Sequence, residues 1–266
     1  MTAFADAAST TLEGDVLAAL DTVMDPELAE PITDLGFVRS VAIDDEGVTA
    51  HLRLPTAFCS PNFAYLMCSD AVDALRLVSG IGVVRVVLDD HHDSDKINAG
   101  LAASAGYVGT FGVEAEESLD ELRLTFQRKA HTAAVERCVE ERLKNSGLAV
   151  ADVYRLQLRN LPGGPFKEAL LRRRVDIGLG IGPDEPVFVD EHGVPVPPDQ
   201  VPLRLRFAKS VRISIEGNSH FCRGLLATRY EDEEDLATRI TNSRTSQGST
   251  SHNRQAHRNQ SVRRAS

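Results

Sequence analysis

Apolar residues in the first third of the chain follow a helical rhythm and then a strand-like one. Between residues 12 and 24 they recur at helical spacing, which predicts a helix there. Pro26 should end this helix, because the residue before a proline avoids helical backbone angles. Alternating apolar and polar residues then predict two half-buried strands, over 37–43 and 48–54, joined as a hairpin.

A second helix and a third strand follow. Ser60 and Pro61 are favoured residues for the cap and first position of a helix. The apolar face of this helix comprises Ala64, Cys68, Ala71, Leu75 and Val78. The Val-rich segment 83–88 is typical of a strand buried on both faces. A strand, a helix and a second strand normally form a parallel crossover, so we predict that strands 48–54 and 83–88 are parallel.

The residue pattern in the second half of the chain predicts another α/β domain, built around a long helix. Capping-box spacing predicts that the helix begins near Ser118, and it can run to Lys144. A short helix is expected over 166–174. Alternation over 203–215 predicts two strands or one bulged strand. The fold class is therefore α/β (α+β): a small α-β-β-α-β domain with a mixed sheet, a second α/β domain with a long helix, and a disordered tail.

Charge divides the 266-residue chain into three parts. Residues 1–110 hold 17 acids and 5 bases, residues 111–239 hold 22 acids and 19 bases, and residues 240–266 hold 5 arginines and no acid. We interpret the first two parts as domains and the last as a disordered basic tail, because it has little apolar surface to bury. An arginine-bearing strand face in the second domain could dock on the acidic first domain or bind a client protein.

Composition excludes several classes of protein. A net charge of −10 and 5% aromatic residues, with no Trp, argue against nucleic-acid binding. No apolar run approaches the ~20 residues that a membrane helix needs, and the N-terminus lacks a signal-peptide pattern. The 4 cysteines contain no CxxC pair, which argues against a disulfide framework or a structural zinc site. We therefore expect a cytoplasmic protein that binds neither nucleic acid nor membranes.

Two polar loops should meet at one edge of the predicted sheet, where the parallel strands end. Cys59 precedes a helix N-terminus, whose positive end favours the thiolate that binds metal or attacks. His91, His92 and Asp93 in the other loop are ligands suited to iron or zinc. Adjacent histidines at a strand end point to opposite sides, so we do not expect both to bind one metal. The alternatives are a buried turn cysteine and a solvated acidic loop.

Three further residues are weaker metal candidates. Asp95 follows the two histidines, and its alternative role is to cap a helix that begins near Lys96. His220 and Cys222 would share one face if residues 220–222 form a strand. Two ligands alone do not define a metal site, so this pair stays secondary.

Short motifs in the first domain give a family resemblance. The segments are Asp25-Pro26-Glu27, Asp34-Leu35-Gly36 and Leu54-Pro55-Thr56-x-x-Cys59. With the helix and Val-rich strand that follow, they resemble the SufT/PaaD-type family, which is linked to metal–sulfur cluster assembly. The likeness covers about residues 12–90. It implies a small α/β domain that helps to assemble or deliver iron–sulfur clusters, and members also occur beside multicomponent oxygenases.

The resemblance assigns roles to individual positions. It implies a reactive or cluster-contacting role for Cys59, and it makes Asp25, Glu27, Gly36 and Thr56 signature residues. The chain departs from the family at Ser60, because the family usually has proline directly after its cysteine. The family motif does not explain residues 111–266.

The leading hypothesis is a non-enzymatic accessory factor that matures a client metalloprotein, such as an oxygenase component. It would bind iron or an iron–sulfur cluster transiently at Cys59, helped by His91, His92 or Asp93. The second domain would recognise the client. The alternatives are a metal-dependent enzyme that uses the loop of His91, His92 and Asp93, and a metal-free structural adaptor for an oxygenase. A homodimer that completes the site also stays open.

Overall fold

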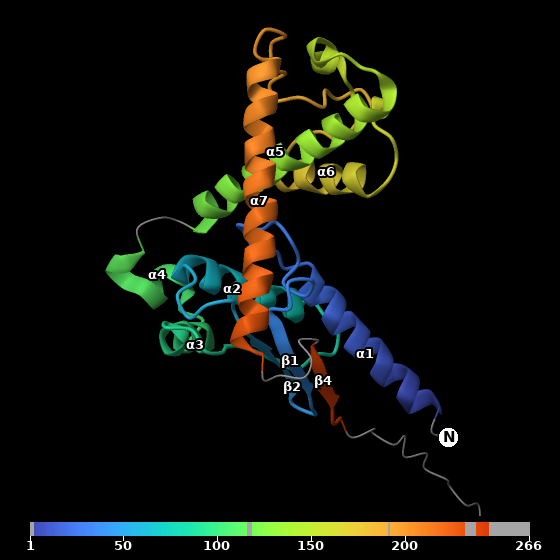
Figure 1. Cartoon of the computed structure of the whole chain (residues 1–266). Coiled ribbons are helices and arrows are strands. Elements are labelled where there is room, and N and C mark those ends of the chain that lie inside the picture. Colours follow the sequence, from blue (N-terminus) through green and yellow to red (C-terminus); the bar gives the residue numbers. More distant parts are fainter. Residues whose placement is uncertain (1–2, 116–118, 191, 232–237, 245–266) are drawn as a thin grey trace, which may run out of the picture.

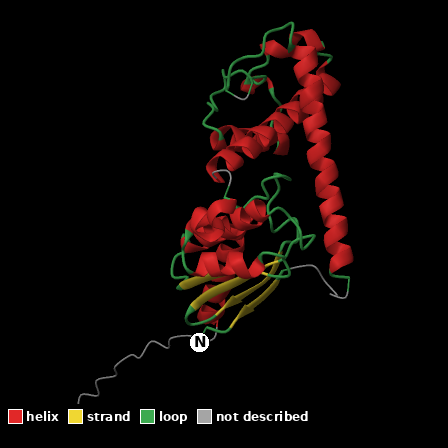
Figure 2. Ribbon diagram, turned by 90° about the vertical axis from the view of Figure 1, so that its left-hand side faces the viewer, coloured by secondary structure: helices red, strands yellow, loops and turns green. Residues whose placement is uncertain are grey.

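The computed structural model describes residues 3–115, 119–190, 192–231 and 238–244. Figure 1 shows two lobes joined by one long helix, α7 (Val201–Arg229). Each lobe has its own cluster of buried apolar side chains. Helix α7 contributes Val201 to the core of the second lobe and Leu226 to that of the first. The same helix therefore spans both lobes, as the side view in Figure 2 shows.

The first lobe is a sheet covered by helices. Its elements are α1 (Ala3–Asp21), β1 (Val38–Ile43), β2 (Gly47–Leu52), α2 (Pro61–Arg76), β3 (Val83–Leu88), α3 (Ser94–Ala102) and α4 (Gly106–Phe111). The predicted α-β-β-α-β order is confirmed, although α1 ends at Asp21 rather than at residue 24. Strands β1 and β2 are antiparallel, and β2 pairs with β3 in parallel, from Gly47 opposite Val83 to Leu52 opposite Leu88. The predicted parallel crossover is therefore present.

The core of the first lobe follows the predicted apolar face of α2. Ala64, Cys68, Ala71 and Leu75 are all fully buried. Strand β3 differs from its prediction, because Val83 is 51% exposed and Arg85 is also exposed. Exposed and buried side chains alternate along β3, so only one face of the strand packs against the core; β3 is also an edge strand of the sheet, whose order is β3-β2-β1-β4.

The fourth strand, β4 (Arg239–Asn242), comes from the far end of the chain and pairs with β1 in parallel. Arg244 follows it and donates to the carbonyl oxygens of Asp44, Gly80 and Ile81. The prediction of a disordered tail from residue 240 is therefore wrong for residues 240–244. The rest of that tail, 245–266, lies outside the described residues.

In the second lobe, α5 (Leu119–Ser146) packs against α6 (Pro165–Asp176) and against the N-terminal half of α7, the upper half in Figure 1. Short 3-10 turns accompany them at Val150–Arg155 and Leu158–Asn160, while a third, Gly112–Glu114, follows α4 in the first lobe. The predicted long helix is confirmed as α5, while Ser118, its expected start, lies outside the described residues. Arg174, near the end of α6, is buried and donates to the carbonyls of Gly180 and Pro186, at 2.6 and 3.0 Å.

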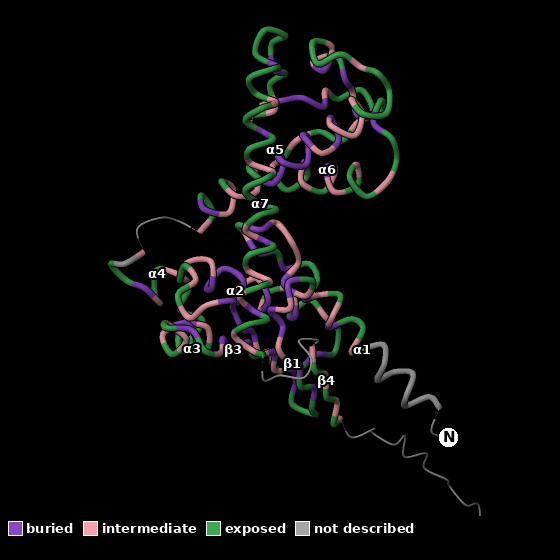
Figure 3. Tube along the Cα trace, in the orientation of Figure 1, coloured by how far each residue is buried: buried purple, intermediate pink, exposed green. Residues whose placement is uncertain are grey.

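The strands predicted over 203–215 are wrong, because this segment is part of α7. Leu203, Phe207 and Ile213, which suggested alternation, are 66%, 59% and 54% exposed. The covered face of α7 recurs instead at spacings of three and four residues: Val201, Leu205, Ala208, Arg212, Ile215, Ser219, Cys222 and Leu226. Half of this face is small or polar, so its helical period is not visible in hydrophobicity. Figure 3 shows the mixture of buried and exposed turns along the helix.

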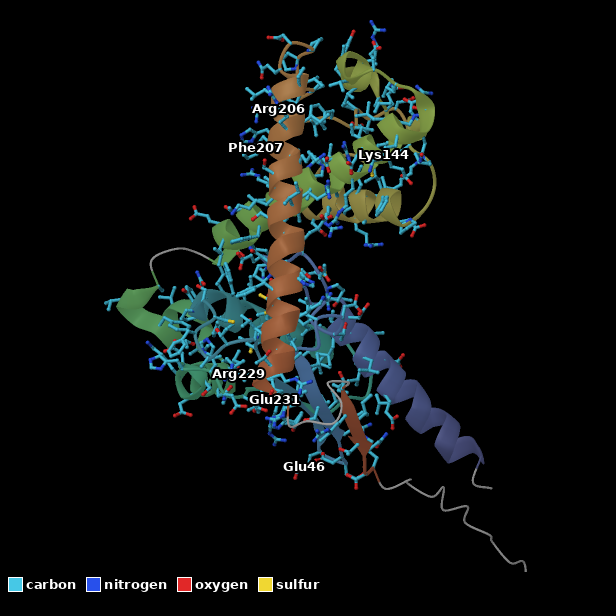
Figure 4. The ribbon with its side chains drawn as sticks, in the orientation of Figure 1. Glu46, Lys144, Arg206, Phe207, Arg229 and Glu231 are labelled. Carbon is cyan, nitrogen blue, oxygen red and sulfur yellow. The ribbon has the colours of Figure 1, made fainter. Side chains whose placement is uncertain are left out.

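The lower half of α7 docks on the acidic first lobe. Arg223 forms an ion pair with Glu30 and donates to the carbonyl of Asp34. Arg229 donates to the carbonyls of Leu54 (3.0 Å) and Asp90. Figure 4 places Arg229 beside the first lobe, whereas Arg206 lies at the other end of α7. Arg223 and Arg229 of helix α7 therefore dock on the acidic first lobe, whereas Arg206, from the predicted arginine-bearing strand face, lies at the other end of the helix.

Candidate functional site

The loops after β2 and β3 contact each other at one edge of the sheet. The backbone N–H of His92 donates to the carbonyl of Ala57, at 2.9 Å. The Nε2 of His91 lies 2.8 Å from the carbonyl oxygen of Cys59. The parallel pairing of β2 and β3 brings these loops together, which confirms the predicted meeting of the thiol loop and the histidine loop.

Cys59 is a half-buried, free thiol immediately before the cap of α2. Its Sγ lies 3.5 Å from the Oγ1 of Thr56, which also accepts a hydrogen bond from the N–H of Phe58. The helix end behind the thiol carries partial positive charge and favours anionic ligands. Cys68, by contrast, is fully buried, and burial raises its pKa to about 12. Of these two thiols, only Cys59 is placed for chemistry.

His91 is buried and positions the Cys59 loop through its ring. The backbone N–H of Asp93 donates to Nδ1 of this ring, at 3.1 Å, so Nδ1 is the acceptor. The proton therefore resides on Nε2 and is donated to the carbonyl of Cys59. Both ring nitrogens are used within the protein, so the imidazole holds the backbone that carries the thiol.

The residues that follow His91 in the loop have different surroundings. His92 is exposed, and its ring lies 5.8 Å from that of Phe58, which is 81% exposed. Asp93, rather than Asp95, occupies the N-cap position of α3, without a side-chain capping bond. Asp95 lies in the first turn of that helix.

The signature acid Asp25 shapes the loop after α1. Its Oδ1 accepts hydrogen bonds from the N–H groups of Glu27 (2.9 Å) and Leu28 (2.8 Å). Burial is the main reason that the pKa of Asp25 is raised to about 6, and the charges of Glu27 and Glu30 add to this. Glu27 itself is exposed and accepts from Asn218 of α7, at 3.1 Å.

Gly36 opens strand β1, as the sequence predicts. Its φ of +74° lies in the left-handed region, which residues with a side chain adopt at a cost. Its carbonyl accepts a hydrogen bond from Nε of Arg53, at 3.1 Å, and Arg53 is fully buried. The glycine therefore allows the backbone to pass from the Asp34-Leu35-Gly36 turn into strand β1.

Helix α7 contacts every signature segment, which the sequence did not reveal. It reaches the Asp25-Pro26-Glu27 segment through Asn218, the Asp34 turn through Arg223, and Leu54 through Arg229. Ser219 also donates to Glu30, at 2.6 Å. No hydrophobic pattern in the sequence marks this contact, because half of the covered face of α7 is small or polar.

Cys222 lies on this docked face and is half-buried against the core of the first lobe. Burial and the nearby charges of Asp25, Cys59 and Glu27 raise its pKa to about 11. His220 is exposed. The predicted strand face shared by His220 and Cys222 is wrong, because residues two apart on a helix point in different directions.

Cys222 of α7 thus interacts electrostatically with Asp25, Glu27 and Cys59, and His91 holds the Cys59 loop. Within the described ranges, no group of three or more His, Cys, Asp and Glu side chains is arranged to hold a metal ion. In the same part of the chain, no helix is both long and apolar enough to cross a bilayer.

Comparison with known proteins bears on the first lobe. The model of a family described as "iron-sulfur cluster assembly protein" matches residues 13–88. The chain is also similar to an uncharacterized protein of Methanocaldococcus jannaschii, MJ1129, with 36% identity over 85 residues that cover 32% of this chain and 87% of that protein. No solved structure matches the chain. The family match includes Cys59 and excludes Cys222.

Proposed function

Because the chain belongs to the iron–sulfur cluster assembly protein family through residues 13–88, we propose that it passes a cluster or iron to a client metalloprotein by transient ligation at Cys59. The protein is then an accessory factor, and the metal is its cargo. The observation that carries the proposal is the position of Cys59: a half-buried thiol at a helix N-terminus, inside the family segment.

The surroundings of Cys59 suit a cargo that must leave again. A full set of four cysteines holds an iron–sulfur cluster firmly, whereas a smaller set leaves iron positions for the ligands of an acceptor. His91 fixes the backbone of the thiol through the 2.8 Å hydrogen bond, and Thr56 lies beside the sulfur. Such second-layer contacts orient a ligand and tune its affinity.

The second lobe is our candidate for client recognition, with an iron oxygenase component as the first client to test. The outer face of α7 exposes Leu203, Phe207 and Ile213. Exposed apolar side chains grouped on one face are typical of protein-binding surfaces. Cargo at the first lobe and a client on the second would share the same helix.

A cluster-transfer assay tests the proposal. The protein is reconstituted with ferrous iron and sulfide without oxygen and then mixed with an apo-ferredoxin, whose visible absorption reports cluster arrival. We expect the Cys59→Ser variant to fold normally and to lose most of the transfer. Cys138→Ala is the matched control, because Cys138 is buried in the other lobe. Transfer by Cys59→Ser at the wild-type rate would refute the assigned role.

The same proteins separate the two alternative functions. A metal-dependent enzyme built on His91, His92 and Asp93 requires one tightly bound metal per chain and turnover without a partner. A metal-free adaptor requires normal client maturation when Cys59, His91 and His92 are replaced together. Both ring nitrogens of His91 are used within the protein, which argues against the metal-dependent enzyme.

A further inference from the structure

We propose that Cys222 of α7 is the second thiol ligand of the Cys59 site, so that iron is held between the family domain and α7. This inference rests on the proposed function and deepens it, because it assigns a ligand that lies outside the family segment. The site would take ferrous iron, or one iron of a small cluster, as its cargo.

Hydrogen bonds on both sides of Cys222 fix its position over the site. Four residues before it, Asn218 binds Glu27 at 3.1 Å, and the adjacent Arg223 binds Glu30 and the Asp34 carbonyl. Seven residues after it, Arg229 binds the carbonyl of Leu54, in the loop that leads to Cys59. One helix face therefore carries Cys222 between contacts to the two loops that frame the site.

Both cysteines pack against the first lobe. Cys59 and Cys222 are each half-buried and each pack against the core of the first lobe. Neither takes part in a disulfide. Two half-buried thiols from elements more than 160 residues apart in sequence thus pack against the same core.

The charges around Cys222 favour a cation. Its electrostatic neighbours are the carboxyl groups of Asp25 and Glu27 and the thiol of Cys59, and all three act in the same direction. A divalent cation would relieve this concentration of negative charge.

The binding step is balanced without a redox partner. Ferrous iron displaces the protons of the two S–H groups, two Fe–S bonds form, and two protons leave to solvent. Thiolates select soft metals, and two of them supply half of a tetrahedral set. The remaining positions are open to sulfide or to the cysteines of a client, which suits a carrier.

Cobalt titration without oxygen is the direct test, with Co²⁺ as the probe, because cobalt–thiolate bonds absorb in the near ultraviolet. We expect wild-type protein to bind one Co²⁺ with a thiolate band. Cys59→Ser and Cys222→Ser should each lose about half of that band, and each should bind Co²⁺ about 10- to 100-fold more weakly. His220→Ala is the matched control, because His220 is exposed and lies two residues from Cys222 on the same helix.

The outcomes distinguish this inference from the proposed function. If Cys222→Ser binds Co²⁺ like the wild type while Cys59→Ser does not, Cys222 is not a ligand and the proposed function stands. If wild-type protein shows no thiolate band, the two-thiol site is overturned, and cluster transfer still decides the function. Cys222→Ala guards against misfolding, since it keeps the half-buried position apolar and should show the same loss as Cys222→Ser.

Discussion

The Cys59 loop and the lower half of α7 meet at one site, but their positions have different origins. Cys59 is placed by neighbours in sequence, Thr56 and the start of α2, and by a parallel crossover within one lobe. Cys222 is placed by a helix that begins at Val201 in the other lobe. The Cys59 half of the site is therefore a property of the family domain, whereas the Cys222 half depends on how the two lobes are joined.

Replacing Arg212 should cause the largest loss of stability, and this loss should be confined to α7 and the second lobe. Arg212 pairs with Glu136 of α5, which is 2% exposed, and also with Glu140 and Glu216. Arg212→Met leaves the buried Glu136 charge unpaired, which should cost about 3–5 kcal/mol of stability in the second lobe. Urea unfolding and hydrogen exchange would measure this, and α7 should lose protection while α2 keeps it.

The double variant Arg212→Met, Glu136→Leu is the control for this experiment, because it removes both charges. It should recover much of the lost stability. Equal loss of protection in α2 and α7 would contradict the separation of the two halves.

Removing His91 should affect the Cys59 half. His91→Ala deletes the hydrogen bonds to the Cys59 carbonyl and the Asp93 N–H and leaves a cavity, so we expect a loss of about 2–3 kcal/mol. His92→Ala is the matched control, because this exposed neighbour should change stability by less than about 0.5 kcal/mol. Thermal unfolding compares the two variants, and equal Tm values would show that His91 does not hold the loop.

The pH dependence of stability should identify Asp25 as a buried acid of the first lobe. Because the fold raises its pKa to about 6, the native state holds the proton more tightly than the unfolded chain. The contribution of Asp25 is therefore most favourable below pH 4 and is lost as the pH rises through 6. Asp25→Asn should match the wild type near pH 4 and exceed it by about 1–2 kcal/mol at pH 8. Urea unfolding at both pH values checks this, and an equal difference at both would contradict it.

The smallest expected effect is that of Arg229, which joins the two halves. Arg229→Ala removes the hydrogen bonds to Leu54 and Asp90 and a contact with the Tyr230 ring, where 5.4 Å separates the guanidinium carbon from the ring centroid. We expect a loss of about 1 kcal/mol, together with faster hydrogen exchange confined to the lower part of α7. The control is Arg206→Ala at the opposite end of α7 (Figure 4), which should leave this exchange unchanged.

The sequence predicted the Cys59 half of the site because each of its determinants is local. The turn at Asp25, the glycine at position 36 and the Ser60-Pro61 helix start all have recognisable chemistry, and the crossover follows from strand order. The hydrogen-bonding role of His91 was not visible, since it depends on the path of a loop 32 residues away in sequence.

The α7 half could not be predicted for physical reasons. Its covered face runs through Arg212, Ser219 and Cys222, which carry no apolar signal, while the exposed Leu203 and Phe207 imitate a strand. Strand β4 is short and polar, and its partner β1 lies about 200 residues earlier. Both elements are fixed by contacts between distant parts of the chain rather than by their own pattern.

If α7 brings the Cys222 thiol next to Cys59, the two sulfurs can be joined by a short cross-linker. Reduced protein is treated without oxygen with a short reagent that bridges two neighbouring thiols, and its peptides are mapped by mass spectrometry. We expect one dominant product, in which the peptide of Cys59 is joined to that of Cys222. Separate modification of the two cysteines, with no bridged peptide, would contradict it.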